Sequence, residues 1–138
     1  MMLLHRATFA EARPITAHRH DQVELVAVQV TSNHPSHHHG VVYLSADQVG
    51  SVHAGLSTLI PGQYGRFDVG SGAEVRQLRH DASPDGEDVV CIRSEHPFGS
   101  GECCLTGRET RYIRSRLGQI GIAFLHENIW GGEDALAQ

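Results

Sequence analysis

Residues 28–35 read Val-Gln-Val-Thr-Ser-Asn-His-Pro, and this stretch returns 62 residues later as Val-Cys-Ile-Arg-Ser-Glu-His-Pro over residues 90–97. Four of the eight positions are identical, a match that chance alone can produce when all offsets are searched. The flanks make chance a poor explanation, because Arg19-His20-Asp21 precedes the first copy and Arg79-His80-Asp81 precedes the second. We therefore interpret the chain as a tandem duplication.

Each copy is predicted to contain a run of strands. Residues 22–32 approach a period-two pattern rich in valine, which is typical of a half-buried strand, and residues 41–44 form its hairpin partner. An earlier strand at 7–17 should lie at a sheet edge, because Pro14 has no amide hydrogen to donate to a ladder. The second copy predicts strands at 67–69, 73–78, 88–94 and 102–105.

Both copies then predict a helix that begins with a capping box. Ser45 stands three residues before Gln48, and Thr106 stands three residues before Glu109. In each pair the hydroxyl can accept a hydrogen bond from the backbone amide of the later residue, and the side chain of the later residue can accept one from the backbone amide of the first. Apolar residues follow at helical spacing and form one stripe per helix. The members of the stripes are Val49, Val52, Leu56, Leu59 and Ile60 in the first helix and Ile113, Leu117 and Ile120 in the second.

Glycine and proline predict where the helices stop. The first helix should run to Pro61-Gly62, and the second should end between Gly118 and Gly121. The apolar residues 122–125 that follow predict a further strand or an extended segment over the core.

Together these elements predict an α+β protein built from duplicated β-β-(β)-α units. The units span about 6–65 and 66–127 of a single domain, 1–138, and a short tail covers 131–138. A hairpin and a helix each expose one apolar face, so both helices should pack on one face of an antiparallel sheet. The two halves should be related by a pseudo-twofold axis.

Composition excludes several classes of protein. The formal net charge is −5 and the pI is about 6.1, so no global basic field favours general binding of nucleic acid. No run approaches the roughly 18 apolar residues of a membrane span. Three cysteines, an odd number, and the lack of a secretory signal predict a cytoplasmic protein with reduced thiols.

The three cysteines lie on one predicted hairpin. Cys103 aligns with Val42 of the first copy and should point toward the helices. Cys91 should face one of Cys103 and Cys104 or lie diagonally from it, and the length of the hairpin loop leaves the register open.

Two related sets of polar residues flank the central strands and are candidates for catalysis. They would place imidazoles and carboxylates at equivalent positions of the two copies, where they could perform acid–base chemistry. The alternative is that these residues simply start turns. The candidates are His20, Asp21 and His34 in the first copy and His80, Asp81 and His96 in the second.

The chain also contains 11 histidines, enough to supply the ligands of a metal ion. Alternate residues of a strand share a face, so the pairs His18/His20 and His37/His39 could bind zinc or nickel. The second copy has Phe98-Gly99-Ser100 where the first has three histidines, which argues against a site inherited with the fold. No cofactor is therefore predicted, and adventitious metal binding is the expected behaviour.

The second helix carries four arginines outside its apolar stripe: Arg108, Arg111, Arg114 and Arg116. The first three are spaced by three residues and cover one outer side of the helix. Such a surface is either a solvated helix face or a contact surface for an acidic protein or a phosphate backbone.

These observations favour a binding protein over an enzyme. The chain contains none of the common nucleotide-binding or hydrolase motifs. We expect a small regulator or inhibitor of bacterial or phage origin that binds a protein partner, with a homodimer left open. The alternatives are a hydrolase or phosphate-handling enzyme that uses the His/Asp sets, and a histidine-rich metal-binding protein.

Overall fold

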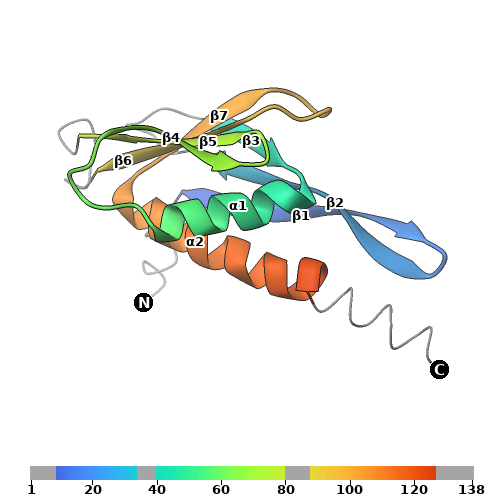
Figure 1. The fold of residues 1–138 in the computed structure, drawn as a ribbon. Coiled ribbons are helices and arrows are strands. Elements are labelled where there is room, and N and C mark those ends of the chain that lie inside the picture. Colours follow the sequence, from blue (N-terminus) through green and yellow to red (C-terminus); the bar gives the residue numbers. More distant parts are fainter. Residues whose placement is uncertain (1–8, 34–39, 80–87, 127–138) are drawn as a thin grey trace.

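The computed structural model describes residues 9–33, 40–79 and 88–126 (Figure 1). Seven strands and two α-helices follow one another in these ranges, and a short π-helical segment, η3 (Gly121–His126), continues the second helix. The elements of the first unit are β1 (Ala10–Arg19), β2 (Gln22–Ser32), β3 (Gly40–Leu44) and α1 (Ala46–Ser57). Those of the second unit are β4 (Gly65–Gly70), β5 (Ala73–Leu78), β6 (Val89–Ser94), β7 (Gly101–Leu105) and α2 (Gly107–Ile120).

The order of these elements confirms the α+β class and the layout in two units. Strands β1-β2-β3 form one antiparallel sheet and β4-β5-β6-β7 form another, so the second unit has one strand more. β1 is an edge strand, as Pro14 predicts, and a register shift between Ile15 and Thr16 further interrupts its ladder. The pseudo-twofold axis stays a prediction.

The strands form two sheets, not the single sheet that was predicted, and the sheets are adjacent where β3 contacts β7. Two glycines at equivalent positions of the units let the backbones approach closely there. A Cβ atom on Gly40 would overlap the carbonyl of Glu102, and a Cβ atom on Gly101 would overlap the carbonyl of Val41. The edges are therefore in contact through backbone atoms, with no side chain between them.

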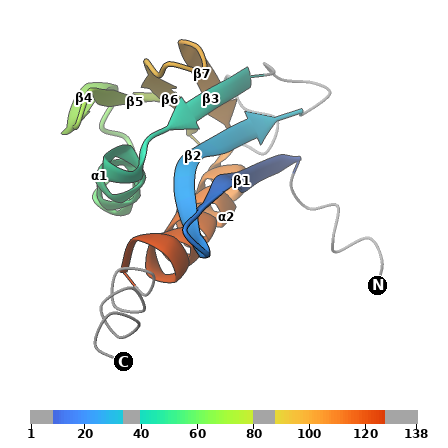
Figure 2. The same ribbon diagram turned by 90° about the vertical axis from the view of Figure 1, so that its right-hand side faces the viewer.

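Both helices lie on the same side of the strands, and each packs against the other unit (Figures 1 and 2). α1 contacts β4 and β5 of the second unit, whereas α2 contacts β1 of the first, and the helices also contact each other. The units are therefore interlocked, and neither helix covers only its own hairpin.

The repeated serine of the opening stretch connects each unit to the helix of the other. Both capping boxes form as predicted. The hydroxyl of Ser94 donates to Gln48 Oε1 of α1 at 3.0 Å, and the hydroxyl of Ser32 donates to Glu109 Oε2 of α2 at 3.4 Å. Glu109 is only 1% exposed, and it also accepts from the backbone amide of Phe9. Each helix N-terminus is thereby fixed to the opposite unit.

The predicted apolar stripes form the core together with the inward residues of the strands, except for Ile60, which is 57% exposed. The fully buried members on the helices include Val49, Val52, Ile113 and Leu117. On the strands they include Val28, Val30, Val42, Leu44, Val75, Ile92 and Leu105. The two copies of the opening stretch thus contribute their alternate residues to one shared core.

The structure differs from three predicted boundaries, and the first is that of β1, which was predicted at 7–17 and spans Ala10–Arg19. α1 ends at Ser57, before Pro61-Gly62, because the amide and hydroxyl of Thr58 both bond to the carbonyl of Gly55 and close the last turn. Leu59 and Ile60 therefore lie outside the helix. Residues 121–126 are π-helical and not extended, because the backbone keeps a helical conformation through Gly121.

The hairpin of β6 and β7 settles the arrangement of the cysteines. Cys91 lies directly opposite Cys104, with Cα atoms 4.0 Å apart, and the two form a disulfide. Reduced thiols were expected for both, so this expectation was wrong. Cys103 points into the core as predicted, and burial, followed by the charges of Glu109 and Glu102, raises its pKa to about 12.

Candidate functional site

A cleft of about 480 Å³ opens where the end of α1 faces the first turns of α2. Its floor is apolar and is formed by Leu56, Leu59 and Val90, with Pro61 at its side. This volume lies within the range of roughly 300–1,000 Å³ that is usual for binding sites of small ligands. The residues come from α1, the loop after it, β5, β6 and α2, so the cleft exists only once the two units have assembled.

One wall of the cleft is a closed network of hydrogen bonds. Asp88 accepts from the amide of Gly62 and the hydroxyl of Tyr64, both at 3.1 Å. The buried side chain of Gln77 donates to the carbonyl of Ile60 at 2.8 Å and to Asp88 at 3.4 Å. These bonds hold the loop after α1 against β5 and the start of β6.

Another wall of the cleft is α2, and it carries two of the predicted arginines. Ile113 and Leu117 turn toward the core, and Arg111 and Arg114 lie outside this apolar stripe. Arg111 and Arg114 are exposed and border the cleft beside Thr110, whose hydroxyl donates to the carbonyl of Thr106. Arg108 is exposed one turn earlier on the same helix. The cleft thus has an apolar floor, an internally bonded wall and a cationic wall.

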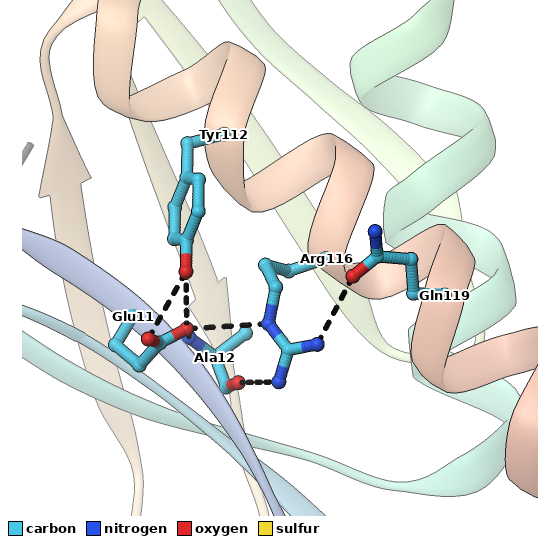
Figure 3. A network of polar contacts seen from close by, with 5 residues as sticks. All are labelled: Glu11, Ala12, Tyr112, Arg116 and Gln119. Atoms are coloured by element: carbon cyan, nitrogen blue, oxygen red, sulfur yellow. Dashed lines mark hydrogen bonds and ion pairs between the residues drawn. The ribbon is translucent and has the colours of Figure 1, made fainter. Parts of the chain in front are cut away.

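Arg116, the fourth of the predicted arginines, contacts β1 (Figure 3). Its Nε atom is 3.3 Å from Glu11 Oε1 of β1, and its Nη2 atom donates to the carbonyl of Ala12. The hydroxyl of Tyr112 donates to the same carboxylate at 2.9 Å, and burial, together with this bond, raises the pKa of Tyr112. Arg116 therefore attaches α2 to β1, and we do not include it in the site.

The different roles of Arg116 and Arg114 predict different effects on stability. Arg116→Ala should lower the free energy of unfolding by about 1 kcal/mol, because it removes an ion pair and a hydrogen bond to the backbone. Arg114→Ala, the matched change on the exposed side, should stay within about 0.5 kcal/mol of wild type. Urea unfolding followed by circular dichroism measures both values, and equal losses for the two variants would contradict this assignment.

The described members of the His/Asp sets do not converge. His20 and Asp21 form the turn of the β1–β2 hairpin, with φ angles of 52° and 65°, and this hairpin extends beyond the helices (Figure 1). His96 lies in the β6–β7 loop, where its ring contacts those of Tyr43 and Phe98 and its Nδ1 accepts from the amide of Phe98. No hydrogen bond or ion pair joins these positions within the described ranges. His34, His80 and Asp81 lie outside the described residues.

The metal candidates are placed only in part. His18 is exposed on β1 and His20 is in the turn, while His37 and His39 lie outside the described residues. In the part of the chain that the structure describes, no three His, Cys, Asp or Glu residues come close enough to hold a metal ion. A zinc or nickel site was an alternative and not the prediction, and no contact among the described residues supports it.

Sequence reasoning did not identify the wall made by Gln77, Asp88 and Tyr64. Gln77 occupies an inward position of β5, whose other inward residues are alanine and valine. A polar residue among buried apolar ones needs hydrogen-bond partners, and this is the one feature of the sequence that could have indicated the network. The partners of Gln77 are 11 to 17 residues away along the chain, so their meeting depends on the fold.

Comparison with known proteins adds little to this geometry. No family model matches the sequence, and no characterised protein does. The chain is similar to a structure described as that of the plant transcriptional regulator PBF-2, with a TM-score of 0.37, 14% identity and coverage of 94% of this chain and 87% of that one. It is also similar to a structure from work on SsgB mutations in the sporulation of Streptomyces coelicolor, with a TM-score of 0.35, 16% identity and coverage of 88% and 98%. TM-scores this low do not establish a common fold. Neither α1 nor α2, the described helices, has the length and apolarity needed to cross a membrane.

Proposed function

We propose that this chain is a regulatory binding protein that recognises an acidic segment of a protein partner through the outer face of α2. We call this surface the arginine face and define it as Arg108, Arg111 and Arg114. The proposal depends on one observation: two of these arginines border the cleft, so cationic and apolar side chains lie next to each other there. The chain as a whole carries a net charge of −5, so the attraction for an acidic partner is local to this face.

The chemistry of the cleft supports binding more than catalysis. Among the described residues that line it, Asp88 is the one carboxylate, and its oxygens already accept bonds from Gly62, Tyr64 and Gln77. The hydroxyl of Thr110 is likewise bonded to the helix backbone. Groups held in this way shape a surface but are poorly placed to transfer a proton to a ligand. The bacterial or phage origin, the cytoplasmic location and the homodimer stay predictions of the sequence.

Capture of the partner from a lysate of the native source tests the arginine face. The immobilised wild-type protein should retain a partner, and the Arg108→Ala/Arg111→Ala/Arg114→Ala variant should retain at least about tenfold less of it. The matched control is Arg13→Ala/Arg66→Ala/Arg93→Ala, which removes the same charge from exposed positions on β1, β4 and β6. Retention should also fall as salt rises, because exposed charges are screened.

Two results of this capture would contradict the proposal. The first is that the variant without the arginine face still retains the partner, whereas the control variant does not. The second is retention that vanishes after nuclease treatment, which would move the arginines to the alternative role of contacting a phosphate backbone.

A further inference from the structure

The cleft beside the arginine face is divided into an apolar part and a charged part. Leu56, Leu59 and Val90 form the apolar floor, and Arg111 and Arg114 stand on the α2 wall. Leu56 and Val90 are themselves members of the main hydrophobic core, 4% exposed each, so the floor is backed by tightly packed side chains. An occupant of the floor would therefore meet a firm apolar surface.

The distribution of charge determines how an acidic segment can enter. Asp88 contributes a negative charge to the cleft lining beside Gly62 and Tyr64, which disfavours a carboxylate next to it. The guanidinium groups of Arg111 and Arg114 favour a carboxylate in the part of the cleft next to α2. A ligand that avoids Asp88 and binds the arginines therefore has an apolar group over the floor and an acidic group beside it, next to α2.

Resting on the proposed function, we infer that the cleft is the anchor pocket for one large apolar side chain of the partner, Phe or Leu, flanked in the partner's sequence by Asp or Glu. Buried apolar or aromatic anchors usually supply most of the affinity of an interface, while charges at its rim supply orientation and speed of association. The arginine face would attract the acidic segment, and the pocket would select the residue within it.

The network around Asp88 makes this pocket preformed. Gln77 Nε2 bonds to the carbonyls of Ile60 and Gln63, and Asp88 bonds to Gly62 and Tyr64, so the loop at 60–64 is fixed along its length. A wall that is already ordered loses little conformational entropy when a ligand binds. The shape of the cleft is thus determined by the fold before the partner arrives.

Fluorescence anisotropy with two labelled peptides tests the inference. The probes are Gly-Asp-Glu-Phe-Asp-Glu-Gly and the same peptide with Ala in place of Phe, which carry equal charge. The wild-type protein should bind the Phe peptide about tenfold more tightly than the Ala peptide. Thr110→Phe should fill the cleft from the α2 wall and reduce the affinity for the Phe peptide to that for the Ala peptide.

Thr110→Val is the matched control, because it removes the same hydroxyl while keeping the side-chain volume, and it should leave the preference for Phe intact. Arg111→Gln/Arg114→Gln should weaken both peptides by a similar factor. Circular dichroism must show that each variant is folded.

Equal affinity of the wild type for the two peptides, no binding of either, or a folded Thr110→Phe variant that still prefers Phe would each overturn the anchor pocket. Equal affinities that still depend on Arg111 and Arg114 would leave the arginine face standing. The capture experiment judges that face independently of the pocket.

Discussion

Replacing Leu117 with Asp should leave the protein unfolded at room temperature. Leu117 is fully buried on the inner side of α2, where it joins the core shared by both units. A carboxylate there would have neither water nor a partner, at a cost comparable to the 5–15 kcal/mol that holds a typical domain together. Far-UV circular dichroism and urea unfolding measure the result.

The control for this change is Ser115→Asp, which introduces the same residue on the exposed side of the same helix. This variant should stay folded and lie within about 0.5 kcal/mol of wild type. A cooperative native transition for Leu117→Asp, with wild-type helix content, would mean that α2 does not pack on the sheets as described.

Adding a single methyl group at Gly101 should be the second most damaging change. The new Cβ atom in Gly101→Ala would overlap the carbonyl of Val41, and the backbone of β3, an edge strand of the other sheet, cannot move aside as a flexible side chain can. We expect a loss of about 3 kcal/mol or more, at the upper end of overpacking costs. The midpoint of urea unfolding measures it.

Gly50→Ala is the matched control, because Gly50 lies on the exposed side of α1 with open space around it. Alanine is the better helix former, so this variant should gain up to about 1 kcal/mol. If Gly101→Ala proved as stable as wild type while Gly50→Ala behaved as expected, the close contact of β3 with β7 would be incorrect.

The parts of the fold that depend on short-range chemistry could be read from the sequence. Ser45 with Gln48 and Thr106 with Glu109 marked both helix starts, because a capping box needs only residues three apart. The end of α1 was placed too late, since Leu59 continues the apolar spacing but packs from a loop. Residues 122–125 were ambiguous because short apolar runs occur in both strands and helices.

The division into two sheets and the cleft itself were beyond prediction from this one sequence. Both depend on segments that meet only in three dimensions: Gly40 with Glu102 at the sheet junction, and Gln77 and Asp88 with α2 at the cleft. The arginines could be identified from the sequence because they lie close together along the chain, within one predicted helix. That two of them border a cleft, while Arg116 is bound to Glu11, follows only from the packing of α2 against the first unit.

The arginine face belongs to one unit alone, although the two units share their framework. The residues of α1 that align with the four arginines of α2 are Asp47, Gly50, His53 and Gly55. His53 instead contacts Gly118 where the helices meet, so its position serves packing. The two units therefore have similar layouts, and the four arginines occur in the second unit alone.

The most direct test of the arginine face is to map the captured partner on the protein by nuclear magnetic resonance. Backbone amide signals of the labelled chain would be compared with and without the partner. We predict that the largest changes fall on residues 107–114 and on the loop at 58–64, around the cleft. Changes confined to the β1–β2 turn at His20 and Asp21, or to the loop that carries His96, would contradict this account and return attention to the histidine sets.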